Sequence, residues 1–180
     1  MDTHNSYQYF DLVFSKKLTQ ALLTCLTCAL PIFSSAQTVQ LEYKGTNTAI
    51  STAVIEANRI LSSPDFHRGV SAVPRFNNTK QSGSQIVDDI KNLRKTVEVR
   101  EYWNPLGANA KTVSVIKINA AKLNRSHAEI TNTVVHETVH AVDWWTNNDW
   151  DYTHDGNSPD GQENTAPWVI GKIAEALVLP

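Results

Sequence analysis

The chain has 180 residues, of which 41% are hydrophobic, and its 16 basic and 18 acidic residues leave a net charge of −2 at pH 7. This length is typical of a single domain. The near balance of charge argues against a polybasic surface, and so against binding to nucleic acid or to an acidic membrane.

The first 36 residues have the pattern of a secretory signal peptide. Lys16 and Lys17 precede the apolar run LTQALLTCLTCALPIF, and the small residues of SSAQ follow it, which predicts cleavage after Ala36. The run is short and interrupted by proline, so we expect no stable membrane insertion once the signal is removed. An uncleaved anchor is the alternative. The mature chain, residues 37–180, is then expected to be a single domain that is secreted or periplasmic.

Signal cleavage would also remove both cysteines from the mature chain. Cys25 and Cys28 are the only cysteines and both lie in the apolar run. The mature chain would therefore have neither a disulfide nor a cysteine nucleophile.

The first half of the mature chain predicts two strands and two helices. VQLEY (39–43) alternates as a strand does, and residues 48–61 carry an apolar stripe at helical spacing. VSAVPRF (70–76) is expected to be a short edge strand, because Pro74 cannot donate to a central ladder. A loop and a second helix, containing Ile86, follow it.

The second half predicts two more strands and two helices. TVEVREYW (96–103) and TVSVIKI (112–118) read as strands separated by a turn-rich connection. Ser126 and Glu129 form a capping box that predicts the start of a long helix. The expected fold class is α+β, with a small mixed sheet packed on this helix.

This long helix carries His136-Glu137-Thr138-Val139-His140, the pattern H-E-x-x-H. Residues i and i+4 are neighbours on a helix, so His136 and His140 can reach one tetrahedral cation. Glu137 projects beside that cation, where it can act as a general base. The helix is apolar nearly everywhere else, and burying two imidazoles and a carboxyl without purpose would be costly. The pattern therefore predicts a metal site.

The segment from Thr133 to Val142, together with TVSVIKI, resembles the zincin superfamily of zinc metallopeptidases. The resemblance implies Zn²⁺ as the cofactor and hydrolysis of peptide bonds by an activated water. It also implies a protein or peptide substrate, bound in an extended conformation along the strand TVSVIKI. Residues 37–100 match no subfamily.

Two histidines do not complete a zinc site, and three residues are candidates for the third position. Asp143 follows one turn after His140, from where reaching back to the metal is awkward, so we expect it to orient an imidazole. His154 lies in the polar loop TNNDWDYTHDGN, which is long enough to turn back toward the helix. This loop resembles that of the SprT-like (Spartan-like) zincins, which implies His154 as the third ligand.

Glu163 is the alternative third ligand, in the manner of gluzincins. Its rival role is a negative charge at the start of the last helix, which Thr165 is expected to cap. Tyr152, two residues before His154, is a candidate donor to the oxyanion. Several tryptophans surround the motif in sequence, among them Trp168, and we expect them to pack rather than to bind substrate.

The leading hypothesis is therefore an exported zinc-dependent metallopeptidase, with a secreted effector as one role. One alternative is a non-catalytic zincin-like protein that binds a metal or a partner. Another is a zinc amidase acting on cell-wall peptides, which fold-level likeness does not separate from a protease. The sequence predicts neither the substrate nor the oligomeric state.

Overall fold

The computed structural model describes residues 38–179 apart from 78, 113 and 147–160. The predicted signal peptide, residues 1–36, lies outside this part of the chain, so its cleavage and the exported location stay predictions. No helix of the described part is long and apolar enough to cross a membrane.

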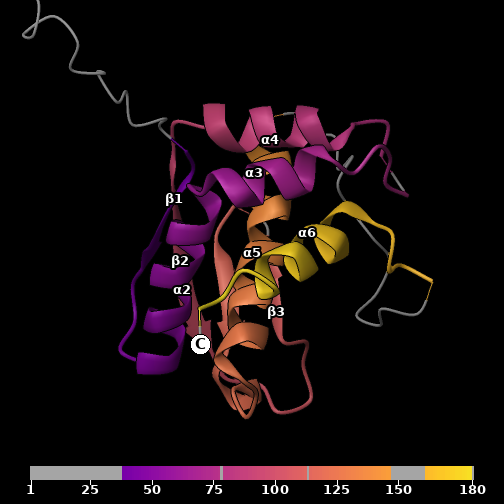
Figure 1. Cartoon of the computed structure of the whole chain (residues 1–180). Coiled ribbons are helices and arrows are strands. Elements are labelled where there is room, and N and C mark those ends of the chain that lie inside the picture. The colour runs from indigo at the N-terminus through magenta and orange to yellow at the C-terminus, as the bar shows by residue number, and fades with distance from the viewer. Residues whose placement is uncertain (1–37, 78, 113, 147–160, 180) are drawn as a thin grey trace, which may run out of the picture. The chain divides into compact units, whose positions relative to one another are not determined.

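The described residues form a mixed α+β structure, as predicted from the sequence (Figure 1). In chain order the elements are β1 Gln40–Tyr43, α2 Thr48–Leu61, α3 Pro64–Ser71, α4 Gly83–Asn92, β2 Thr96–Tyr102, β3 Ala110–Thr112, β4 Ile116–Asn119, the 3-10 helix η1 Ala120–Lys122, α5 His127–Thr146 and α6 Ala166–Glu175. The helix expected over residues 48–61 is confirmed, with the side chain of Asn47 capping its first turn.

The four strands form one mixed sheet in the order β1-β2-β4-β3. β1 and β4 are parallel to β2, whereas β3 is antiparallel to β4. The expectation of a single strand over residues 112–118 is wrong. The chain reverses between Thr112 and Ile116, so that Lys111 pairs with Lys117, and the predicted strand is the end of β3 followed by most of β4.

The edge strand expected over residues 70–76 is also wrong, because its first residues end α3. Pro64 stands at the start of this helix, and the Ser63 side chain accepts a hydrogen bond of 3.2 Å from the backbone N–H of Phe66. Phe66 and Val70 are both fully buried on one helix face. Capping and this apolar pair therefore make a short helix where the alternation of apolar residues indicated a strand.

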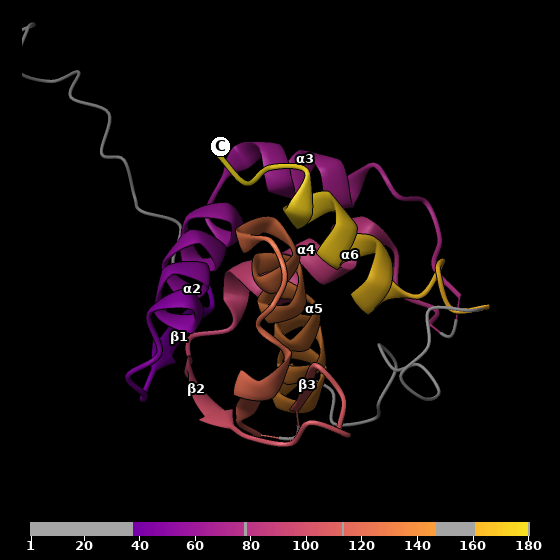
Figure 2. The same ribbon diagram turned by 90° about the horizontal axis from the view of Figure 1, so that it is seen from below.

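Helix α5 is the centre of the fold. Its first turn has the predicted capping box: the Glu129 carboxylate accepts from the Ser126 backbone N–H at 2.8 Å, and Ser126 Oγ accepts from the Glu129 N–H at 3.2 Å. α5 packs against α2 on one side and α6 on the other, and it also contacts β3 and β4 (Figures 1 and 2). Its apolar side chains are buried, namely Ile130, Val134, Val135, Val139, Ala141 and Val142. Burial of each stabilises the fold by about 1–3 kcal/mol.

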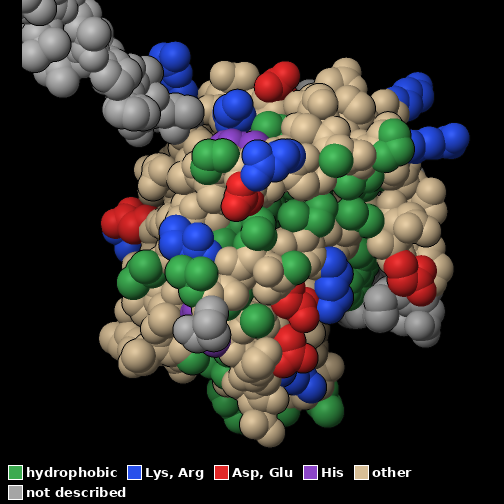
Figure 3. All heavy atoms as spheres, viewed as in Figure 1, with side chains coloured by type: hydrophobic (Ala, Val, Ile, Leu, Met, Phe, Trp, Pro, Cys, Tyr) green, Lys and Arg blue, Asp and Glu red, His purple; other side chains and the backbone are tan. Residues whose placement is uncertain are grey.

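Helix α6 covers the flank of α5. Ile170 and Ala174 are fully buried, while Val169 and Ile173 are partly buried against the core. Figure 3 shows hydrophobic side chains gathered over α3 and α6 on this face of the molecule. Gly171 lies so close to Asn132 of α5 that a Cβ added there would stand 2.4 Å from the Asn132 Oδ1. A larger residue at this position would therefore require the Asn132 side chain to move.

Candidate metal centre on helix α5

His136 and His140 lie on neighbouring turns of α5 and face the same side. Their ring centroids are 5.2 Å apart with an interplanar angle of 65°. His136 is buried, with 7% of its surface exposed, and His140 is half-buried. Two imidazoles in this arrangement can supply half of a tetrahedral zinc site.

Trp168 from the first turn of α6 packs edge-on against His136. The centroids of the two rings are 4.8 Å apart, with an interplanar angle of 75°. α6 begins after Thr165 with Pro167 in its first turn, as expected, although the Thr165 hydroxyl donates to the Gln162 carbonyl instead of capping the helix. Trp168 packs against His136, and its ring restricts the rotation of the His136 imidazole; Trp168 also lines the cavity beside Glu137.

Glu137 is held by a residue that sequence reasoning gave no role. The Thr112 hydroxyl, at the end of β3, donates a hydrogen bond of 2.6 Å to the Glu137 carboxylate. Burial raises the pKa of Glu137 to about 7, although the bond from Thr112 acts in the opposite direction. A carboxyl with a pKa near neutrality is suited to take up and release a proton. The signal for Thr112 was its place at the start of a strand predicted to run along the site.

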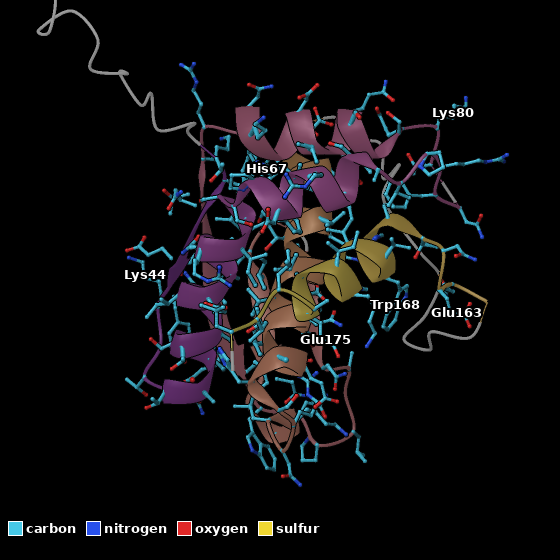
Figure 4. All side chains as sticks on the ribbon, in the orientation of Figure 1. Lys44, His67, Lys80, Glu163, Trp168 and Glu175 are labelled. Atoms are coloured by element: carbon cyan, nitrogen blue, oxygen red, sulfur yellow. The ribbon has the colours of Figure 1, made fainter. Side chains whose placement is uncertain are left out.

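Of the remaining predicted site residues, the structure describes Asp143 and Glu163 but not His154 and Tyr152. Asp143 is completely buried on α5, one turn beyond His140. His154 and Tyr152 lie outside the described residues, so their predicted roles are untested. Glu163 is exposed on the turn before α6, and in Figure 4 it stands on the far side of Trp168 from α5.

The described residues contain no group of three or more His, Cys, Asp or Glu side chains that could hold a metal ion. Glu163 is therefore not beside the histidine pair in this structure. The donor set fits zinc as far as His136 and His140 reach, and these two imidazoles are the part of such a site that the described residues bring together.

A cavity of about 240 Å³ opens beside Glu137 and His136. Its walls are the first half of α5, the first turns and the end of α6, and the stretch 108–110 that leads into β3. The buried Asn119 holds this stretch in place, because its amide donates to the carbonyl oxygens of Ala108 at 2.8 Å and Asn104 at 2.6 Å. The cavity wall is therefore built on rigid structure.

Charged groups line the end of this cavity away from Glu137. Lys172 donates to Glu175 at 2.7 Å, so these two charges offset each other. Arg125 donates to the Thr133 hydroxyl and to the Lys122 carbonyl, both at 2.8 Å. Burial lowers the pKa of Arg125, and the nearby Glu129 opposes this shift. The positive and negative groups of the cavity therefore nearly balance, beside an apolar part formed by Ala108, Ala110 and Trp168.

Strand β3 presents a free edge beside the site. Asn119 N donates to Asn109 O at 2.8 Å, and the alternation of an antiparallel ladder then turns the backbone groups of Ala110 and Thr112 away from β4. β3 is the last strand of the sheet among the described residues. An extended peptide can add to this edge next to Glu137.

Comparisons of the chain with family models, with curated protein sequences and with solved structures found no match. The chemistry of the site is therefore read from the side chains of α5, β3 and α6. Their arrangement places a histidine pair, a buried carboxyl and a strand edge next to one another.

Proposed function

We propose that the chain is an exported zinc-dependent metallopeptidase of zincin-like architecture. The observation that carries the proposal is the contact between Thr112 and Glu137, which joins a free strand edge to the carboxyl between two histidines of one helix. A site that only bound a metal would have no use for a buried carboxyl beside the ligands.

His136 and His140 would hold the zinc, with His154 as the proposed third ligand. The chemistry that zinc supplies when bound is Lewis acidity, which makes a water molecule a nucleophile near neutral pH. Trp168 holds the His136 ring from one side, so that the imidazole is oriented before a metal arrives.

Glu137 would act as the general base and then as the general acid. Its carboxylate lies between the two histidines in sequence and is buried, so it can take a proton from the attacking water and return it to the leaving amine. The Thr112 hydroxyl keeps the carboxylate oriented during both transfers. Water is largely excluded at this point, since Glu137 is 7% exposed.

The free edge of β3 would bind the peptide. A substrate strand can exchange backbone hydrogen bonds with Ala110 and Thr112, and alternate side chains would then point toward α5. The cavity beside Glu137 offers space of about 240 Å³ for one of them.

The test uses residues 37–180 as a purified protein. We expect about one equivalent of bound zinc, and hydrolysis within a peptide library that Glu137→Gln lowers by about three orders of magnitude while zinc stays bound. The matched control is Glu42→Gln, which changes an exposed carboxyl on β1 and should leave hydrolysis unaltered. Zinc binding without hydrolysis would instead identify a non-catalytic protein, and cleavage confined to cell-wall peptides would identify an amidase.

A further inference from the structure

Three basic side chains face each other across three adjacent strands. The register pairs Arg100 of β2 with Lys117 of β4, and Lys117 with Lys111 of β3. All three are exposed, while Ile116 and Ile118 on the opposite face of β4 are fully buried. The basic row, defined as Arg100, Lys117 and Lys111, therefore lies on the solvent face of the sheet.

Like charges directly opposite one another destabilise a sheet, so this row has an energetic cost. Arg100 is offset by Glu98, to which its Nε donates. Lys111 lies over the ring of Tyr102, 4.8 Å from the centroid. Lys117 has no carboxylate partner among the described residues. Among the described residues, the ammonium groups of Lys111 and Lys117 thus stand together with only the Tyr102 ring to stabilise one of them.

The row surrounds a hollow that can hold a ligand group. A cavity of about 350 Å³ is lined by Arg100, Lys111 and Lys117, together with Thr112 at the end of β3 and Ser114 and Val115 of the β3–β4 turn. The three cations and the Ser114 hydroxyl are donors that suit a carboxylate or another oxyanion.

The position of this cavity relates it to the proposed peptide edge. Residues directly opposite each other on paired strands place their side chains on the same face of the sheet. A peptide strand added to β3 would therefore direct the residue opposite Lys111 over the basic row. The residues opposite Ala110 and Thr112 would point the other way, toward α5 and Glu137.

We propose that the basic row binds acidic side chains of an extended peptide that pairs with β3, so that Asp or Glu is preferred opposite Lys111. This inference rests on the proposed function in taking β3 as the edge that holds the substrate. It adds the substrate class, namely peptides with acidic residues at alternate positions.

The surroundings of the row favour a peptide over a nucleic acid. Glu98 stands next to Arg100 and pairs in register with Glu42 of β1, so negative side chains limit the row on that side. The three cations span only two strand spacings, about 10 Å, which is too short to follow a phosphate backbone. A peptide can in addition use the backbone edge of β3, which a nucleic acid cannot pair with as a strand.

The experiment measures peptide binding and peptide cleavage separately. The binding probe is a fluorescein-labelled decapeptide of alternating Glu and Thr, compared with Gln–Thr and Lys–Thr peptides by anisotropy on the Glu137→Gln protein. We expect the Glu peptide to bind at least about ten-fold more tightly than the Gln peptide in low salt, and about equally in high salt. Lys111→Gln should remove most of the preference, and Lys111→Glu should transfer it to the Lys peptide.

The control is Lys80→Glu, which makes the same change of charge on the connection between α3 and α4 (Figure 4) and should leave the preference intact. Equal binding of the Glu and Gln peptides in low salt would overturn the inference, as would tighter binding of single-stranded DNA of matched charge. Cleavage by the wild-type protein distinguishes the two proposals. An acidic peptide that binds but is not cleaved contradicts the peptidase, whereas cleavage without acidic preference contradicts only the basic row.

Discussion

The Thr112 hydroxyl donates a 2.6 Å hydrogen bond to the Glu137 carboxylate, and this bond joins the edge strand of the sheet to the central helix. Thr112 belongs to the strand whose free edge is proposed to hold the peptide, and Glu137 is the proposed base. Whatever displaces β3 therefore also moves the carboxyl. Peptide binding to β3, as proposed, would therefore be coupled to the orientation of Glu137 through this one contact.

Replacing Thr112 tests that coupling. Thr112→Val keeps the shape of the side chain but removes the donor, so Glu137 loses its orientation and one stabilising hydrogen bond. We expect kcat to fall by about ten-fold, with zinc content unchanged and KM little altered. Thr112→Ser retains the hydroxyl and should restore most of kcat. If the valine and serine variants were equally impaired, packing rather than the hydrogen bond would be the cause.

The histidine pair makes a prediction about metal content. Because His136 and His140 present their imidazoles from neighbouring turns, each supplies a ligand that the other cannot replace. His136→Ala or His140→Ala should therefore lower zinc affinity by at least about three orders of magnitude, measured against a competing chelator. His67→Ala is the matched control, because the His67 ring bonds to the Leu61 carbonyl at 2.8 Å. Full zinc retention by either α5 variant would contradict the site.

Two variants, for which we expect opposite changes in zinc affinity, distinguish the two candidates for the third ligand. His154→Ala should lose zinc affinity by orders of magnitude, because it removes the proposed third ligand. An imidazole is the expected ligand because, being neutral, it leaves the bound metal with its full positive charge and therefore strongly Lewis acidic. Glu163→Gln should keep the zinc, since Glu163 is exposed and not grouped with the histidine pair. Zinc titration of both proteins is the measurement. A site emptied by Glu163→Gln but loaded in His154→Ala would mean that the turn before α6 folds onto the metal.

The buried carboxyl predicts how stability changes with pH in metal-free protein. The pKa of Glu137 in the fold is about 7, above its ordinary value of 4.5, so folding favours the protonated form. This contribution is fully present below pH 4.5 and is lost progressively as the pH rises to 7. We expect the free energy of unfolding to fall by about 3 kcal/mol over this range because of Glu137 alone.

Urea unfolding in the presence of a chelator measures this loss, with Glu137→Gln as the reference protein. The amide does not titrate, so the difference in free energy between the two proteins should change with pH while other groups cancel. If both proteins had the same pH dependence, Glu137 would titrate normally and would not be a buried base.

Sequence patterns determined the elements that depend on local physics. The helix over residues 48–61, the capping box at Ser126 and Glu129, and the α+β class follow from periodicity and side-chain capping, and the structure confirms them. The spacing of His136, Glu137 and His140 likewise needed only the geometry of one helix.

Local patterns failed where two elements compete or must meet. VSAVPRF alternates as a strand does, but Ser63 and Pro64, outside that segment, cap a helix that extends into it. TVSVIKI has no marked turn signal, and its reversal is visible only in the pairing of Lys111 with Lys117. Short apolar runs are ambiguous because the residues of a strand do not by themselves determine which other strand it pairs with.

Tertiary structure alone decided what surrounds the motif. Thr112 lies 25 positions before Glu137, and Trp168 reaches His136 from another helix, so no spacing rule connects either pair. The raised pKa of Glu137 depends on burial by the whole core, and the basic row exists only because three strands align in one register. Sequence specified the groups that can do chemistry, while packing determined which of them meet, because contacts between distant residues depend on the fold as a whole.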